Sequence, residues 1–501
     1  ASIGINMSGG GHFNSGDNVN AVVVDIGSYA SKLGFAGEDT PKSYFRSNTA
    51  ISGTGENISI KYDYYTRPLE GDDTYKVSNP VDDVTGLWYG ETEMWYKLLE
   101  KYIQHGYESS LNTKTEYHPM LLIERSYNPP AIRQQVLELL MEDLQVPAAF
   151  LARDATMSCY ACGRTAGTVV DIGYSGTTVT PVYDGYVETK GIRRLPIGTR
   201  KMDDLIVKDL DAIHGKPFLP IYQVQKHSKR QDPIHNLARL QIAQQCREEG
   251  AGAAVLQVSD AGFTAPSMTF ELPDGTTVDI PSKKRFGVAN AILGQQEEAV
   301  SIRDEALSIM EGRLKERISQ ADVEFTEDEA EDKEHYEEVF SKASSVGLLK
   351  RQQPENKHKE RKGISYSWKY LKKACLGDLQ EQQDYLTSSA IPSMVCDAAF
   401  RCDREQQPNL MGNVVVGGGG ACLGPTDQSL TDFLREQVES IIHQHTPGWR
   451  VKVLSPNFQE RSICSWLGGS ILGSLGTFHD MWVTKKEYDE WGPAIVNRKC
   501  P

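Results

Sequence analysis

The sequence predicts an α/β fold made of two related lobes, and three glycine-bearing turns carry the prediction. Residues 22–41 and 167–185 each contain an apolar run that ends in Asp-Ile-Gly and is followed by a second strand-like run. Both patterns are typical of a β-hairpin with a tight turn. Residues 413–434 hold a third apolar run, four successive glycines and a helix-like stretch. Two similar hairpins indicate a duplicated domain whose turns hold a nucleotide phosphate chain from two sides.

Hydrophobic periodicity predicts the elements around these turns. Strands are expected at 21–25, 32–36 and 120–124, and a helix is expected at 130–144. A further helix is expected at 91–105, where four apolar side chains share one face: Trp95, Leu98, Leu99 and Tyr102. Residues 47–81 are polar and are expected to be irregular, with aromatic side chains at Tyr62, Tyr64 and Tyr65.

Length and composition fit a globular protein with more than one core. The 501 residues are 39% hydrophobic and 24% charged, with no apolar run of membrane-spanning length. Residues 1–18 are rich in Gly, Ser and Asn, so we expect them to be disordered and to carry no signal segment. The net charge of −15 argues against a broad DNA-binding surface. This acidity either attracts basic partners such as histones or keeps the protein soluble.

The nine cysteines show no complete metal-binding pattern. Cys159 and Cys162 are spaced as C-x-x-C, which leaves open a zinc or redox site. No second pair completes such a site, and we expect both residues on one helix before Gly163. Scattered cysteines of this kind favour a reducing compartment, the cytosol or the nucleus.

The three glycine-bearing segments resemble the two phosphate loops and the adenosine segment of the actin superfamily. Residues 160–173 and 465–501 are also similar to actin, the second stretch nearly residue for residue. The resemblance implies an actin/hexokinase/heat-shock-70-type fold, which is a duplicated, ribonuclease-H-like, two-lobed ATPase fold with four subdomains. Residues 253–260, 271–286 and 498–501 look like the nuclear actin-related proteins of the fourth class, found in chromatin remodelling and histone acetyltransferase complexes.

The resemblance also implies a division of the chain. Subdomain 1 is expected at 19–46, 82–161 and 464–501, and subdomain 2 at 47–81. Subdomain 3 is expected at 162–197 and 386–463, and subdomain 4 at 198–294. Residues 295–385 form an insertion relative to actin.

The insertion begins with a helical apolar pattern formed by Ile302, Ala306, Ile309, Met310 and Leu314. An acidic run at 324–338 and a basic run at 357–362 follow. Charge runs of this kind are either solvated segments or a dedicated partner surface.

The resemblance assigns a nucleotide site for ATP and Mg²⁺. Asp25 and Asp171 match the aspartates that hold magnesium through water. Ser28 matches a serine that contacts the terminal phosphate, and Lys32 matches a lysine that binds the phosphates. Arg247 and Glu248 match, more loosely, a pair near the base and ribose. The whole predicted nucleotide site consists of Asp25, Gly27, Ser28, Tyr29, Lys32, Asp171, Gly173, Arg247, Glu248, Gly417, Gly418 and Gly419.

The shell that hydrolyses ATP in actins is altered in this sequence. The glutamine that orients the attacking water falls at Asp154, whose carboxylate adds negative charge beside a phosphate. The second-loop aspartate falls at Tyr174, the following glycine at Ser175 and the histidine at Thr178, while Tyr29 replaces a first-loop glycine. On the adenine side, a lysine falls at Ser462 and a tyrosine at Cys422. We therefore expect ATP binding with weak or absent hydrolysis, and no catalytic residues.

A surface for helical partners is implied as well. Ile471, Leu472 and Leu475 follow a helical spacing, which suits either a groove for an amphipathic helix or core packing. The full partner surface implied by the resemblance is Tyr160, Gly163, Thr165, Ile471, Leu472, Leu475, Thr477 and Met481. Its expected occupant is the helicase-SANT-associated helix of a remodelling ATPase or a scaffold subunit, which would also carry actin.

Three functions compete at this point. The first is a nuclear, non-filament-forming structural subunit of chromatin remodelling or histone acetyltransferase complexes, with actin and histones or the nucleosome as partners, little direct DNA binding and no membrane. Roles in transcription regulation and DNA repair would follow. The second is an active ATPase of the same fold, and the third is a cytoskeletal filament former. The changes at Asp154 and Tyr174 argue against an active ATPase. The segments 47–81 and 295–385, which do not resemble actin, argue against a filament former.

Overall fold

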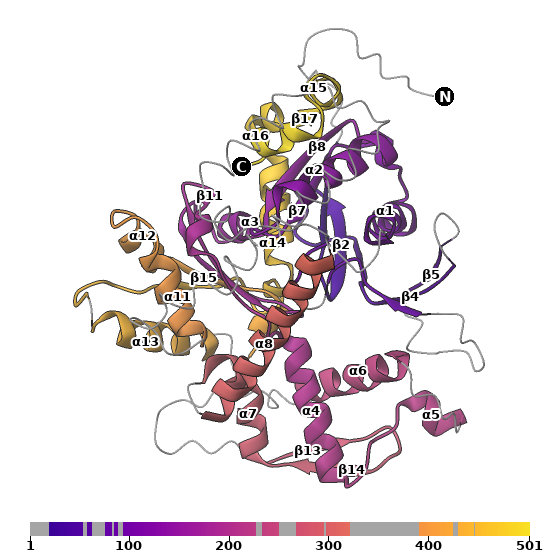
Figure 1. Cartoon of the computed structure of the whole chain (residues 1–501), viewed down its shortest axis with the longest axis vertical. Helices are drawn as coiled ribbons and strands as arrows, with labels where there is room; N and C mark the ends of the chain where they lie inside the picture. Colours follow the sequence, from indigo (N-terminus) through magenta and orange to yellow (C-terminus); the bar gives the residue numbers. More distant parts are fainter. Residues whose placement is uncertain are drawn as a thin grey trace.

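The computed structural model contains two lobes, each built on a six-stranded mixed sheet (Figure 1). It describes residues 20–53, 58–62, 76–82, 85–88, 94–226, 233–249, 267–294, 297–320, 390–423, 429–444 and 446–501. The expected disorder of 1–18 and the charge runs at 324–338 and 357–362 lie outside these residues. Among the described residues, no helix combines the length and apolar character needed to cross a bilayer.

The first sheet has the order β17-β8-β7-β1-β2-β3. Its strands are β1 Val22–Ile26, β2 Ala30–Phe35, β3 Ser43–Arg46, β7 Met120–Glu124, β8 Ala148–Arg153 and β17 Val483–Thr484. β1 and β2 form the predicted hairpin, while β1, β7 and β8 run parallel. Parallel strands end at one edge of a sheet, so the residues that follow β1, β7 and β8 gather there.

The second sheet repeats this design. Its strands are β9 Gly167–Ile172, β10 Thr177–Tyr183, β11 Tyr186–Val187, β12 Arg193–Leu195, β15 Val414–Gly417 and β16 Val453–Leu454. β9 and β10 form the second hairpin, and β15 runs parallel to β9 with Gly417 opposite Asp171. The third glycine-bearing segment is thereby placed beside the second hairpin turn.

Helices cover both sheets. In the first lobe they are α1 Met94–Gly106, α2 Pro130–Glu138, α3 Asp154–Ala161, α14 Cys464–Ser474, α15 Lys485–Trp491 and α16 Val496–Lys499. In the second they are α4 Thr199–His214, α5 Ile221–Lys226, α6 Pro233–Glu249, α7 Ser282–Leu293, α8 Glu297–Gln320, α11 Ile391–Phe400, α12 Gln407–Met411 and α13 Ser429–Ile442. A π-helical turn at Leu139–Asp143 continues α2 over the rest of the helix predicted at 130–144.

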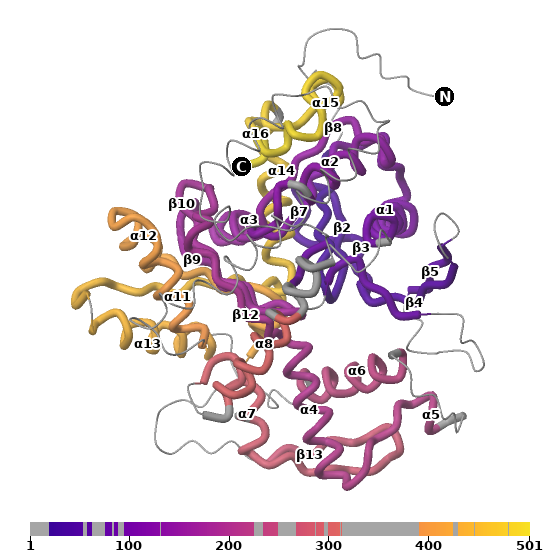
Figure 2. Tube along the Cα trace, in the orientation of Figure 1, coloured from indigo at the N-terminus to yellow at the C-terminus, as the bar shows by residue number. Residues whose placement is uncertain are grey.

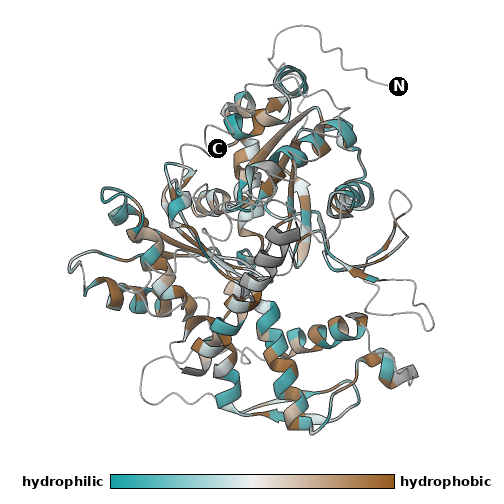
Figure 3. Cartoon of the chain, in the orientation of Figure 1, coloured by the Kyte–Doolittle hydropathy of each residue, from teal (hydrophilic) through white to brown (hydrophobic). Residues whose placement is uncertain are grey.

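Each lobe has its own hydrophobic core around its sheet, and Figure 3 shows apolar residues along the central strands. Val22, Val23 and Val24 are fully buried, as expected for a strand covered on both faces. The C-terminal segment returns to the first lobe, where α14 lies against β1 and α3 (Figure 2). α14 approaches α3 so closely that a Cβ at Gly468 would lie 1.8 Å from the Met157 carbonyl oxygen, so only glycine fits.

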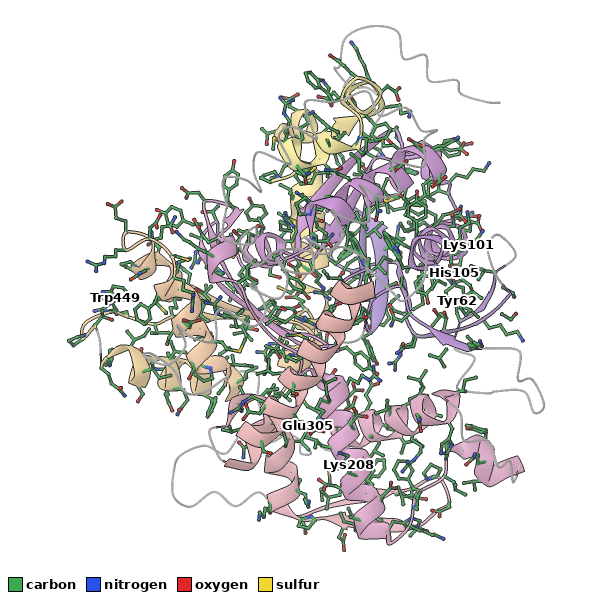
Figure 4. All side chains as sticks on the ribbon, viewed as in Figure 1. Tyr62, Lys101, His105, Lys208, Glu305 and Trp449 are labelled. Carbon is green, nitrogen blue, oxygen red and sulfur yellow. The ribbon has the colours of Figure 1, made fainter. Side chains whose placement is uncertain are left out.

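The expectation that 47–81 is irregular is wrong for the described part of that segment. It forms a three-stranded sheet of β4 Thr49–Ser52, β5 Ser59–Lys61 and β6 Lys76–Ser78. Its central strand β4 is buried, whereas β5 and β6 are partly exposed, and Tyr62 anchors the sheet to α1. The Tyr62 ring stacks on His105 at 3.7 Å between centroids, and its hydroxyl donates to the Lys101 carbonyl oxygen at 3.5 Å (Figure 4).

The start of the insertion is helical, as its pattern predicts. α8 packs against α7, and the buried Arg303 guanidinium donates to the carbonyl oxygens of Ala291 and Gly294 at 3.3 and 2.8 Å. Met310 is fully buried and belongs to the core of the first lobe, whereas Ala306 belongs to the core of the second. The described part of the insertion is therefore integrated with both lobes. The remaining small sheet pairs β13 Met268–Glu271 with β14 Thr277–Ile280.

Candidate functional site: a cavity between the lobes

The two hairpin turns and the glycine run meet at a cavity of about 830 Å³ between the lobes. Eleven of the twelve predicted nucleotide-site residues line it: Asp25, Gly27, Ser28, Tyr29, Lys32, Asp171, Gly173, Arg247, Glu248, Gly418 and Gly419. Gly417 does not line the cavity. It is buried at the end of β15, where an added Cβ would lie 3.2 Å from the Cβ of Cys464. The cavity has the size of a small-molecule site.

Asp25 is held by a cation from its own hairpin. β1 and β2 place Asp25 opposite Lys32, whose Nζ lies 2.8 Å from Asp25 Oδ2. The Ser465 hydroxyl donates to the same oxygen at 3.2 Å. Burial disfavours the charge of Asp25, but the charge and hydrogen bond of Lys32 outweigh burial, so the pKa of Asp25 lies below its ordinary value. Lys32 is correspondingly held in its protonated form.

Arg125 is a cavity residue that the sequence analysis missed. It directly follows β7, at the edge where β1 and β8 also end. Its Nη1 lies 3.1 Å from Asp154 Oδ2 and 3.1 Å from Asp171 Oδ2, so it joins the two lobes. Burial raises the pKa of Asp171, although the Arg125 charge acts in the opposite direction. No glycine or acidic motif marks Arg125, and only the parallel register of the strands could have indicated it.

Asp154, to which the actin resemblance assigns the place of the water-orienting glutamine, forms hydrogen bonds with both of its carboxylate oxygens. Oδ1 accepts from the backbone N–H and hydroxyl of Ser126 at 2.9 and 2.5 Å, and from the Ala155 N–H at 2.8 Å. Oδ2 accepts from Arg125 at 3.1 Å. Thr178, at the position of the histidine, is buried, and Arg194 donates to its hydroxyl at 3.4 Å. These groups are therefore engaged within the protein, whereas water activation needs a free polar acceptor.

The two hairpin turns contact one another through aromatic side chains. The Tyr29 and Tyr174 rings lie 5.3 Å apart, and the Ser175 N–H donates to the Ser28 hydroxyl at 3.3 Å. Gln244 of α6 donates to the Tyr29 hydroxyl, and the Arg46 guanidinium covers the Tyr29 ring at 4.0 Å. Burial raises the pKa of Tyr29 to about 12. These contacts join the lobes at the phosphate-facing turns.

Arg247 and Glu248 lie at the end of α6. The Arg247 Nε lies 2.7 Å from Asp203 Oδ1, and its side chain is almost fully buried, whereas Glu248 is exposed. Burial raises the pKa of Asp203 to about 6 despite the Arg247 charge. Arg247 is thus a fixed cavity wall held by a buried carboxylate.

The opposite wall is formed by the glycine run and the segment before α14. Gly418 has φ = 90°, and an added Cβ would lie 2.4 Å from Asp171 Oδ1, so this turn requires glycine. Cys422, Phe458, Arg461 and Ser462 continue the wall. The arrangement gives a flat ligand group access to the backbone, beside the small side chains of Cys422 and Ser462.

The predicted partner surface lies outside the cavity, in the first lobe. Ile471, Leu475 and Met481 are 41, 47 and 43% exposed, whereas Leu472 is partly buried against the core. Tyr160 is partly buried, and Gly163, Thr165 and Thr477 are exposed. The expectation that Leu475 continues the helical face is wrong. α14 ends at Ser474, and Leu475 is its C-cap with extended backbone, its N–H donating to the Leu472 carbonyl oxygen.

The acidic residues fit a divalent cation poorly. Asp25 is paired with Lys32, and Asp171 is paired with Arg125. A magnesium ion between these carboxylates would lie beside a fixed guanidinium, and like charges in a partly buried site repel strongly. The described residues also contain no group of three or more His, Cys, Asp or Glu side chains arranged to hold a metal. Cys159 lies in α3 and Cys162 is its C-cap, hydrogen-bonded to Cys464, and the structure describes all three as free thiols.

Comparison with known proteins agrees with this architecture. The family model described as Actin matches residues 16–501. Actin-related protein 4 of Oryza sativa subsp. indica is 28% identical over 537 residues, covering 97% of this chain and 99% of that protein. The proteins of that name from Arabidopsis thaliana and Schizosaccharomyces pombe are 27 and 28% identical, with the same coverage. These matches confirm the predicted family and its two-lobed fold: the chain belongs to the actin family.

Proposed function

We propose that this chain is a nuclear actin-related protein that binds ATP without turning it over. The observation that carries the proposal is the state of Asp154. Its Oδ1 accepts three hydrogen bonds from Ser126 and Ala155, and its Oδ2 is held against the Arg125 guanidinium, which leaves the carboxylate poorly placed to orient an attacking water. The cavity nevertheless keeps cationic groups and glycine turns suited to a polyphosphate. This combination supports ATP binding with little or no ATP hydrolysis.

We propose further that the chain is a structural subunit of chromatin remodelling or histone acetyltransferase complexes. Support comes from its similarity to proteins named Actin-related protein 4 and from the exposed apolar residues at the end of α14. Three large apolar side chains, each more than 40% exposed, suit the apolar face of an amphipathic helix. The proposed partners are actin, the helicase-SANT-associated helix of a remodelling ATPase or scaffold subunit, and histones or the nucleosome.

Two experiments test these proposals. Nucleotide-free protein should gain thermal stability with ATP through mass action, with phosphate release far slower than that of conventional actin. Rapid phosphate release would favour the active ATPase instead. Affinity purification followed by mass spectrometry should recover actin together with a remodelling ATPase or an acetyltransferase scaffold. Recovery of cytoskeletal proteins alone would refute the nuclear assignment.

A further inference from the structure

Arg125 occupies the centre of the charged part of the cavity. Its side chain is 23% exposed, and its Nη1 lies at equal distances of 3.1 Å from Asp154 of the first lobe and Asp171 of the second. Two carboxylates from different lobes therefore fix one guanidinium between the phosphate-facing turns. A planar guanidinium holds such a bridge with less loss of side-chain entropy than a lysine would.

The guanidinium keeps donors for a ligand. Among the described residues, Nη1 is the one guanidinium nitrogen of Arg125 that has a hydrogen-bonding partner, and it faces the two carboxylates. Nε and Nη2 remain for an anion in the cavity. Arginine donors and metal ions both neutralise phosphate charge, and an arginine does so with directed hydrogen bonds.

Asp25 has a cation of its own, because Lys32 lies 2.8 Å from it and Ser465 donates to the same oxygen. Both carboxylates that the actin resemblance assigns to magnesium are therefore paired with positive side chains of the chain itself. A divalent cation would have to displace one of these side chains or lie against it. Lys32 and Arg125 thus take the positions beside these carboxylates that a metal ion would otherwise occupy.

We propose that Arg125 takes the place of the divalent cation, so that this cavity binds a nucleoside polyphosphate as the free anion. This inference rests on the proposed nucleotide binding and specifies its chemistry. Arg125 positions and neutralises the phosphate chain from the first lobe, and Lys32 does so from the first hairpin. Magnesium is then dispensable for binding.

The test measures ATP affinity of the nucleotide-free full chain by calorimetry, once with excess magnesium chloride and once with EDTA. The wild type should show the same Kd in both conditions, within about threefold. Arg125→Ala should weaken binding in EDTA by about tenfold or more, and magnesium should restore part of it. Arg435→Ala is the matched control, because it removes an equal charge from the exposed face of α13 and should change neither value.

The outcomes separate the two claims. Wild-type binding that is lost in EDTA would overturn the role of Arg125 and leave nucleotide binding intact. An absence of ATP binding in both conditions would overturn both. If Arg125→Ala does not fold, Arg125→Lys replaces it, since it keeps the charge. That variant should still bind in EDTA, and a strict magnesium requirement in it would refute the charge argument.

Discussion

Replacing Leu475 by aspartate should abolish capture of a partner helix. The Leu475 side chain is 47% exposed, so a partner can cover about half of it. Complete burial of a leucine contributes about 1.5–3 kcal/mol, so the uncovered half corresponds to about 1 kcal/mol. Desolvating an aspartate against an apolar helix face adds at least the about 1–3 kcal/mol that an uncharged polar group costs. The total loss is at least about 2–4 kcal/mol, or on the order of 30- to 700-fold or more in Kd.

The assay is co-purification with actin and the remodelling-ATPase helix, followed by a titration of the purified helix. Leu219→Asp provides a matched control, because Leu219 is 46% exposed but lies between α4 and α5 in the other lobe. The control should bind the helix like the wild type. ATP-induced stabilisation should persist in both variants, since neither residue lines the cavity. Helix capture by Leu475→Asp at wild-type affinity would show that this surface is not the docking site.

Three further predictions follow from the site and the insertion. Asp154→Gln should not restore phosphate release, because Tyr174 and Thr178 remain changed; a release rate near that of conventional actin would contradict the account of the site. Burial raises the pKa of Asp203 from 3.8 to about 6, so its contribution to stability is complete below pH 3.8 and is lost as the pH rises through 6. Relative to Asp203→Asn, the wild type should therefore lose about 2 kcal/mol of unfolding free energy between pH 4 and pH 7 in denaturant titrations; a constant difference would refute this. The purified chain should stay in the supernatant under polymerising salt, and filaments in electron micrographs would refute the non-filament assignment.

The sequence predicted the elements that have strong local signals. The Asp-Ile-Gly hairpins and the glycine run are local signals for turns between apolar strands, so their predicted positions in β1–β2, β9–β10 and after β15 are confirmed. The sheet of β4, β5 and β6 was missed because its strands have only three or four residues, and β4 is the one strand among them with buried side chains. Such strands depend on pairing between distant segments, which leaves no alternating pattern.

The end of α14 was missed for a related reason. The spacing of Ile471, Leu472 and Leu475 fits a helix, but Gly473 and Gly476 flank the last turn and lower its helical propensity. The helix ends at Ser474, and Leu475 projects from the turn that follows. Spacing alone could not separate these two arrangements, although both leave the side chain exposed.

The contact between Arg125 and Asp154 could be predicted only from the register of the parallel strands β7 and β8. Asp154 alone suggests a negative charge that opposes phosphate binding. The parallel pairing of β7 with β8 places Glu124 opposite Arg153, so the next residues, Arg125 and Asp154, leave the sheet side by side. There the guanidinium neutralises the carboxylate and reaches Asp171 across the cavity. Under the proposed function, Asp154 replaces a water-orienting group and also helps to anchor a cation beside the phosphates, which is how such a site would lose hydrolysis and keep binding.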